Sequence, residues 1–161
     1  MKKGLEYIQG STKRSLDIIG AAALLSVLAP VGAAAAVGVC IDTKDFNPIF
    51  PQVRNGEGGK QFNALKLRTI ARTLTEGVPA QVLGTFDPRA SAYGLALRKY
   101  GLDEVPQIVN VFRGEMSLVG MRPLSDEGLN LFQESDPKLF DDWYGYFTAS
   151  KPGLAVPELY L

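Results

Sequence analysis

Hydrophobic residues in this chain form one long run near its start, followed by several short segments with clear periodicity. No residue from Ile18 to Ile41 carries a charge. As one straight helix this run would be about 36 Å long, enough to cross a hydrocarbon core of about 30 Å. A helix of this length that is apolar on all sides is unusual in a soluble protein. The run is therefore predicted to lie in lipid.

Pro30 lies near the middle of this run. Proline removes a backbone donor and clashes with the preceding turn, and each arm alone is too short to span a bilayer. The pattern favours a re-entrant helix-break-helix with both ends on one side of the membrane. Two alternatives stay open. Membrane helices tolerate proline, so a kinked spanning helix would fit. A signal peptide would also fit, because basic residues precede the run and Ala33 to Ala36 offers a cleavage site.

Two short apolar segments on either side of a glycine-rich stretch predict a β-hairpin. They run from Phe50 to Val53 and from Gln61 to Leu67, with the glycines between them. A phosphate-binding loop is the alternative, but Gly-Gly-Lys is not followed by Ser or Thr, so the Walker pattern is not met. Lys66 and Arg68 lie two residues apart and are expected on one face of the second strand.

The remaining hydrophobic positions predict short helices separated by polar loops. Residues 93–100 have helical spacing and carry Arg98, and residues 126–134 and 136–149 form two further segments of this kind. An aromatic stripe in the last segment fits either a core or a belt at headgroup depth. Residues 75–90, rich in Gly, Pro and Thr, are predicted to form a loop near the site. The predicted fold is mostly α with a small β-hairpin, an α+β class.

Composition narrows the chemistry that the chain can perform. Its 161 residues support one domain with at most a small appendage, and a formal net charge of zero gives no sign of nucleic-acid binding. There is no histidine, which excludes Ser-His-Asp and Cys-His catalysis and histidine-based zinc sites. Proton transfer and metal binding therefore fall to Asp and Glu. The single cysteine, Cys40, is predicted to be a small packing residue.

Two adjacent carboxylates, Asp103 and Glu104, are followed by Arg113 and Arg122. Adjacent acids can divide phosphoryl chemistry, with one attacking phosphorus while the other holds a divalent metal, and arginine matches phosphate oxygens bidentately. Alternatively, Asp103 is the N-cap of an amphipathic helix, with Pro106 tolerated in its first turn. That helix would place four apolar residues on one face: Val105, Ile108, Val109 and Phe112. Both roles are compatible, because a helix N-terminus also favours phosphate.

The order of these motifs resembles the bacterial sugar transferase family, the monotopic polyprenyl-phosphate phosphoglycosyl transferases. The matching blocks span nearly the whole chain: Lys13-Arg14-x-x-Asp17-Ile18-Ile19, the run broken by Pro30, Pro48 to Gly56, Gly59-Lys60-x-Phe62, Lys66-Leu67-Arg68-Thr69, Leu102 to Gly114, Met116 to Gly120 and Lys151-Pro152-Gly153. The chain departs from the family pattern at Ala29, Pro51 and Met121. It also departs after Gly153, where the family commonly continues for some tens of residues.

The resemblance implies a membrane-anchoring re-entrant region over residues 1–44 and a compact cytoplasmic catalytic domain with interfacial helices over residues 45–161. The expected location is the cytoplasmic face of a bacterial inner membrane, with monotopic topology. Expected partners are a UDP-sugar, polyprenyl phosphate and membrane lipids, with a homo-oligomer possible and no nucleic acid.

The resemblance also implies the chemistry. Asp103 attacks the β-phosphorus of the UDP-sugar, releases UMP and becomes an aspartyl-phosphosugar. Polyprenyl phosphate then displaces it as polyprenyl-diphosphate-sugar, the first membrane step of glycan assembly. Glu104 would hold Mg²⁺. The expected substrate-binding residues are Arg98, Arg122, Lys66, Arg68 and Gln107.

A protein of another class remains the alternative. It would be a non-catalytic membrane-associated scaffold, or a secreted binding module behind a signal peptide. The short C-terminus favours this alternative, whereas the intact Asp103-Glu104 pair and the arginines argue against it.

Overall fold

The computed structural model describes residues 10–74 and 87–156, so most of the predicted loop over residues 75–90 lies outside the described residues. The helices and 3-10 turns are α2 (Ser11–Thr43), η1 (Glu57–Gly59), η2 (Arg72–Leu74), α3 (Ala92–Lys99), η3 (Leu102–Gln107), α4 (Ile108–Arg113), α5 (Asp126–Ser135) and α6 (Pro137–Ala149). The strands are β1 (Ile49–Asn55), β2 (Gln61–Leu67), β3 (Ser117–Val119) and β4 (Gly153–Ala155). The chain is mostly helical with small sheets, as predicted.

The predicted β-hairpin is present as β1 and β2. The strands pair antiparallel, with Ile49 opposite Leu67 and Asn55 opposite Gln61. Between them, Gly58 and Gly59 have φ angles of 67° and 69°, which residues with a side chain rarely adopt. The glycines therefore form the turn of a hairpin.

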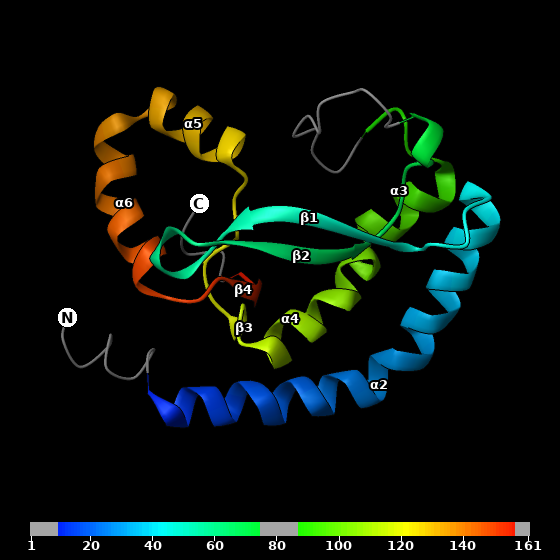
Figure 1. Ribbon diagram of the computed structural model, residues 1–161, viewed down its shortest axis with the longest axis horizontal. Helices are drawn as coiled ribbons and strands as arrows, with labels where there is room; N and C mark the ends of the chain where they lie inside the picture. The colour runs from blue at the N-terminus through cyan, green and yellow to red at the C-terminus, as the bar shows by residue number, and fades with distance from the viewer. Residues whose placement is uncertain (1–9, 75–86, 157–161) are drawn as a thin grey trace.

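A second, parallel strand pair was not predicted. Ser117 of β3 lies opposite Gly153 of β4, and Val119 lies opposite Ala155. At Gly153 a Cβ would lie 2.1 Å from the backbone nitrogen of Gly120. Only glycine allows this approach, which brings the segment after α6 back beside the end of α4 (Figure 1).

The apolar run forms α2, a helix long and apolar enough to cross a membrane by length and composition. Helix α2 is continuous, with Pro30 inside it. The prediction of a helix break at Pro30 was therefore wrong. A proline removes one donor while the hydrogen bonds on either side persist, so the helix bends instead of ending. Figure 1 shows the axis of α2 changing direction about midway, so that the helix curves around the remaining elements.

One edge of α2 packs on the domain and the rest is uncovered. Ala21 and Ala35 lie in the two hydrophobic clusters, against α4 and against β2 and α3. Lys13 and Asp17 form a 2.5 Å ion pair, and Asp17 also accepts hydrogen bonds from the Ser117 hydroxyl and from the backbone of Leu118. Much of the remaining apolar surface is exposed, at Leu16, Ile18, Ile19, Leu25, Val27, Val31, Val37 and Ile41.

Helices α5 and α6 confirm the two predicted C-terminal helices. Their aromatic rings contact one another. Phe132 of α5 meets Phe140 and Trp143 of α6 edge to face, and within α6 Phe140 stacks on Tyr144 and Trp143 on Phe147. Phe140 and Phe147 are buried, whereas Leu139 on the predicted stripe is exposed. The stripe is thus partly core and partly surface.

Candidate functional site

Asp103 lies inside a 3-10 turn and does not cap a helix. Gly101, with a φ of 68°, starts η3, and no side chain caps this turn. The regular helix α4 begins only at Ile108, after Pro106. The cap interpretation of Asp103 was therefore wrong. The Asp103 side chain is instead buried, with 7% of the residue exposed.

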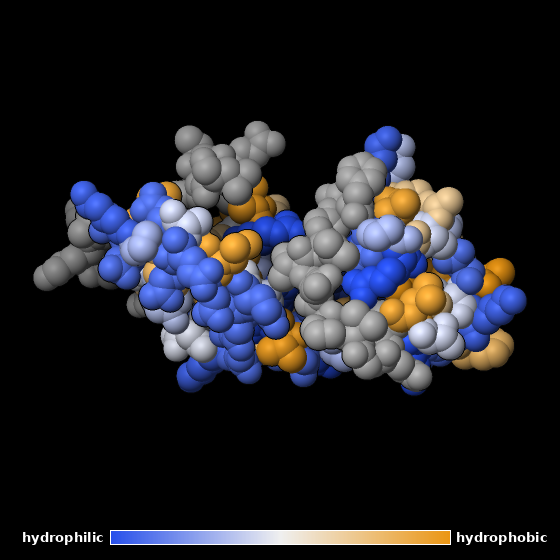
Figure 2. All heavy atoms as spheres, turned by 90° about the horizontal axis from the view of Figure 1, so that it is seen from above, coloured by the Kyte–Doolittle hydropathy of each residue, from blue (hydrophilic) through white to orange (hydrophobic). Residues whose placement is uncertain are grey.

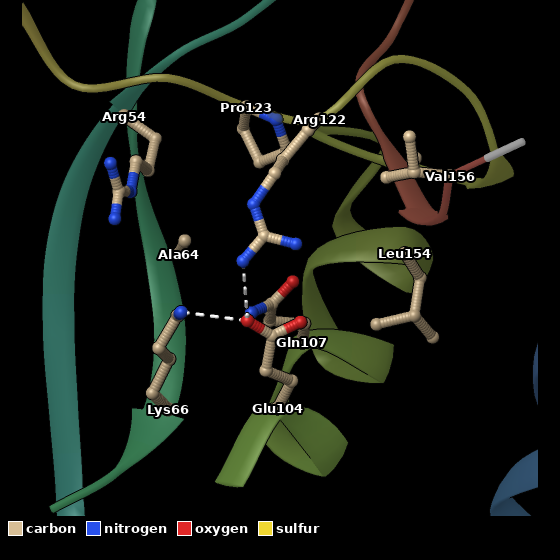
Figure 3. A pocket seen from close by; sticks show the side chains of 10 residues that line it. Arg54, Ala64, Lys66, Glu104, Gln107, Arg122, Pro123, Leu154 and Val156 are labelled. Atoms are coloured by element: carbon tan, nitrogen blue, oxygen red, sulfur yellow. Dashed lines mark hydrogen bonds and ion pairs between the residues drawn. The ribbon is translucent and has the colours of Figure 1, made fainter. Parts of the chain in front are cut away.

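Glu104 forms ion pairs with two cations from different parts of the chain. The Lys66 ammonium of β2 donates a hydrogen bond of 2.7 Å to its carboxylate, and the Arg122 guanidinium lies 3.5 Å from the same oxygen. These side chains line one pocket, together with Gln107 at its floor (Figure 3). The structure therefore brings together four of the predicted residues.

A buried asparagine fixes the distance between the hairpin and the carboxylates. The Asn110 side chain is fully buried on α4; its amide donates to the Asn63 carbonyl at 2.7 Å, and its oxygen accepts from the Leu65 backbone at 3.0 Å. Its amide also donates to Glu115. These bonds extend the edge of β2 onto α4 and bring Lys66 to Glu104.

The loop that carries Arg122 is held over the hairpin by a second network. The Asn55 backbone donates to the Leu124 carbonyl at 2.8 Å, and its side-chain amide donates to the Asp126 carboxylate at 2.7 Å. Gln61 donates to the other oxygen of Asp126 at 2.9 Å. Both ends of the hairpin turn are therefore tied to the start of α5.

The two neighbouring carboxylates have opposite electrostatic environments. Burial raises the pKa of Asp103 above its ordinary value, and Lys66 and Arg98 offset this only in part. Burial would also raise the pKa of Glu104, but Lys66, Arg122 and Arg54 outweigh it, so the pKa of Glu104 is lowered. Glu104 is thus the stable anion of the pair, and Asp103 is the poorly solvated one.

Two further predicted residues lie in different settings. Arg98, on α3, donates to the Thr69 hydroxyl at 2.8 Å and is close enough to act on the charge of Asp103. Arg68 lies beyond the end of β2, where it donates to the carbonyls of Asn47 and Ile49. It is not among the residues that line the pocket.

The sequence missed several residues of the pocket. Arg54 of β1 lines the pocket beside Ala64 and Lys66, while Leu154 and Val156 form an apolar wall on the other side (Figure 3). The hairpin register contains the signal for Arg54, because residues 54, 62, 64 and 66 share one face of the paired strands. No comparable signal pointed to Leu154, because the parallel pairing of β4 was not predicted.

The carboxylates fit Mg²⁺ only in part. Across residues 10–74 and 87–156, no group of three or more His, Cys, Asp or Glu side chains could hold a metal ion. Mg²⁺ is commonly held by one or two carboxylates together with substrate phosphates. Asp103 and Glu104 could provide the carboxylates. The chain therefore fits a metal that binds together with a phosphate substrate.

Comparisons with known proteins agree with the motif pattern. Residues 8–157 match the family described as Bacterial sugar transferase. The chain is 40% identical over 111 residues to a UDP-glucose:undecaprenyl-phosphate glucose-1-phosphate transferase of Caulobacter vibrioides, covering 69% of this chain and 41% of that protein. It is 37% identical over 112 residues to an undecaprenyl-phosphate glucose phosphotransferase of Komagataeibacter xylinus, covering 69% and 21%.

A third relative is aligned over more of its own length. This is the exopolysaccharide production protein ExoY of Rhizobium meliloti, 31% identical over 167 residues, covering 91% of this chain and 67% of the relative. The chain thus spans less than half the length of the first two relatives and two thirds of the third.

Proposed function

The chain belongs to the bacterial sugar transferase family, and we propose that it transfers a sugar phosphate from a UDP-sugar to polyprenyl phosphate. The products are UMP and a polyprenyl diphosphosugar. The observation that carries this proposal is the adjacent pair of a buried Asp103 and a partly exposed Glu104, with three cations acting on it from β2, α3 and the loop before α5. Relatives named as undecaprenyl-phosphate sugar phosphotransferases support it. These relatives do not support the scaffold or the secreted module.

The reaction proceeds in two displacements at one phosphorus atom. An oxygen of the Asp103 carboxylate bonds to the β-phosphorus of the UDP-sugar, and the bond to the bridging oxygen breaks, so that UMP leaves with the electron pair. Burial suits Asp103 to this role, since a weakly solvated carboxylate is more basic and more nucleophilic. A phosphate oxygen of the lipid then bonds to the same phosphorus and restores the Asp103 carboxylate.

The surrounding side chains bind and orient the phosphates. Lys66 pairs with Glu104 and also acts on the charge of Asp103, and Arg122 lies 3.5 Å from the same Glu104 oxygen, so both can neutralise phosphate charge as it develops. Arg98 acts on the Asp103 side, and Gln107 offers an amide at the pocket floor. Mg²⁺ bound at Glu104 would add charge neutralisation at the diphosphate.

Many of the exposed large apolar side chains of the described residues lie on α2. Viewed from the side away from the N-terminal half of α2, the described surface combines hydrophilic regions with several hydrophobic patches (Figure 2). The exposed apolar residues of α2 lie on a helix with few buried positions. We therefore place residues 1–44 in the cytoplasmic leaflet as a re-entrant anchor, with residues 45–161 as the catalytic domain on the cytoplasmic face. Assembly of copies into an oligomer stays a prediction.

A burst experiment without lipid tests the covalent step. Purified protein given UDP-sugar and Mg²⁺ should release at most about one UMP per active site and retain the phosphosugar, as ping-pong chemistry requires. Asp103→Asn should keep the fold, because Asp103 makes no cap hydrogen bond, and should form no adduct. A panel of UDP-sugars in the same assay identifies the donor.

The controls separate the mechanisms. Arg113→Gln removes a cation from the last turn of α4, outside the pocket, and should leave the burst unchanged. UMP release that needs lipid would instead indicate direct transfer in a ternary complex. An Asp103→Asn protein that still retains sugar phosphate would rule out Asp103 as the nucleophile.

A further inference from the structure

Arg54 is a cation of the pocket whose direct hydrogen-bond partner is neutral. Its guanidinium donates to the Gln52 side-chain oxygen at 2.8 Å, and the Glu104 and Glu127 carboxylates act on its charge without forming an ion pair with it. In the part of the chain that the structure describes, no carboxylate forms an ion pair with it, and Glu104 is already shared by Lys66 and Arg122. Three cations thus face one firmly ionised carboxylate in this pocket.

The cations divide between the two sides of the carboxylate pair. The positive charges that act on Asp103 are those of Lys66 and Arg98. Those that act on Glu104 are Lys66, Arg122 and Arg54. Arg54 and Arg122 also repel each other, and Arg54 is partly buried, so both effects lower its pKa. Two like charges held together in this way are stabilised by a dianion between them.

The chemistry of the proposed function requires an anion on that side. When Asp103 attacks phosphorus in line, UMP leaves from the face opposite Asp103. In the second displacement the lipid phosphate must attack from the face opposite the Asp103–phosphorus bond, which is the face that UMP has left. The departing and the entering group are both phosphate monoesters, so one subsite can hold each in turn.

We propose that Arg54 and Arg122 form a single phosphate-monoester subsite, which holds the phosphate of UMP as it departs and then the phosphate of polyprenyl phosphate as it enters. The assignment rests on the proposed two-step transfer for its order of events. Leu154 and Val156, on the opposite wall, give the rest of either ligand an apolar surface (Figure 3). The hairpin register holds Arg54 on the same face as Lys66.

Equilibrium binding tests the subsite without turnover. The full chain in detergent micelles is titrated with UMP, and separately with a short-chain polyprenyl phosphate, by calorimetry. Each ligand should displace the other. Arg54→Gln should weaken both by about tenfold to a hundredfold, the effect of losing one hydrogen bond to a charged group. Arg54→Lys should restore part of the affinity for both.

Two further variants make the test specific. Gln52→Glu places a carboxylate beside Arg54 without removing it, so the cation is neutralised and both ligands should again bind more weakly. Arg113→Gln removes an exposed arginine outside the pocket and should leave both affinities unchanged. Circular dichroism of each variant shows whether the fold is kept, and Gln52→Glu and Arg54→Lys keep the test decisive if Arg54→Gln unfolds.

The outcomes distinguish the subsite from the reaction. If UMP and the lipid phosphate bind at the same time, or if Arg54→Gln weakens only one of them, the shared subsite is overturned and the cation belongs to one substrate alone. If Arg54→Gln binds both as tightly as the unmodified protein, Arg54 has no role there. If the burst experiment fails while competition and the Arg54 effect persist, the two-step mechanism falls and the subsite stands.

Discussion

At the scale of single residues, Asp103 and Glu104 are neighbours in sequence, yet their carboxylates differ in solvation and in charge partners. Glu104 has two cations within 3.5 Å, whereas Asp103 is buried with its compensating charges farther away. Lys66 acts on both carboxylates. It is therefore the side chain through which the protonation of the pair can be altered most directly.

Lys66→Gln should move the acid limb of the pH–rate profile to higher pH. In the proposed reaction Asp103 must be ionised to attack, its pKa is already raised by burial, and Lys66 is the strongest of the charges that lower it. Without Lys66, protonation of Asp103 therefore stops the reaction at a higher pH. The measurement is kcat/KM for UMP release against pH, with Arg113→Gln as a control whose limb should not move. An unmoved limb in Lys66→Gln would show that Asp103 does not govern it.

Asp103→Asn should stabilise the protein at neutral pH while it lowers activity by about a thousandfold or more, as loss of a nucleophile does. The pKa of Asp103 is higher in the folded state, so its contribution to stability is complete below the unfolded pKa and is lost as pH rises through the folded value. Tm in detergent should therefore be higher for Asp103→Asn at neutral pH, and the difference should shrink toward acid pH. A lower Tm at neutral pH would contradict this.

Some of these residues could be predicted from sequence and some could not. The adjacent carboxylates and Arg122 lie in one local segment, so local motifs identified them. The pairing of Lys66 with Glu104 depends on a hairpin that folds against η3. Arg68 lies outside the pocket because β2 ends before it, so that its guanidinium donates to the carbonyls of Asn47 and Ile49. Periodicity fixes the face of a residue, but not the point at which a strand stops.

At the scale of elements, buried polar side chains hold the site together. Asn110 joins α4 to the edge of β2, and Asp17 joins α2 to β3. Neither residue touches the pocket. Each satisfies backbone or side-chain groups that lie about fifty to a hundred residues away, so their loss should loosen the site indirectly.

Asn110→Ala should destabilise the fold by about 1–3 kcal/mol, because the Leu65 N–H and the Asn63 carbonyl would lose a buried partner. The hairpin would then be less firmly held, and KM for the UDP-sugar should rise. Thermal unfolding in detergent and the UMP-release assay measure the two effects. Asn47→Ala, on the exposed segment before β1, is the control and should change neither.

The hairpin was predictable because its two strands are close in sequence and its turn requires glycine. The β3–β4 pair was not, since each strand has three residues and two helices separate them. Two such short segments show no alternation that distinguishes them from loops. Sequence patterns therefore identified the local elements, whereas the contacts that complete the pocket come from pairings distant along the chain.

At the scale of the whole molecule, α2 is the element that the proposed function places in a membrane. The helix keeps its hydrogen bonding past Pro30, yet its axis turns midway, as Figure 1 shows. Contacts from both arms hold this curve, through Asp17 on one side and Val39 on the other. The curve is therefore favoured by domain packing as well as by the proline.

Both ends of α2 should be accessible from the cytoplasmic side. In a Cys40→Ala background, a cysteine at position 3 and another in place of Glu57, exposed in the hairpin turn, should both react with an impermeant maleimide added to inverted vesicles. Neither should react in intact spheroplasts, and both should react in detergent as a control. Labelling of the two positions from opposite sides would contradict the re-entrant anchor.

Pro30→Leu should shift part of the population to a spanning orientation. Leucine restores the missing N–H and makes a straight helix of about 50 Å the natural form of α2, which exceeds the bilayer thickness. Straightening would pull α2 away from either the Asp17 or the Val39 contacts. Opposite-side labelling should appear in a fraction of molecules, and UMP release should fall by the same fraction.

Ala29→Leu adds a similar apolar side chain at an exposed position while keeping the proline, and should leave labelling and activity unchanged. If Pro30→Leu also leaves them unchanged, domain packing alone sets the bend.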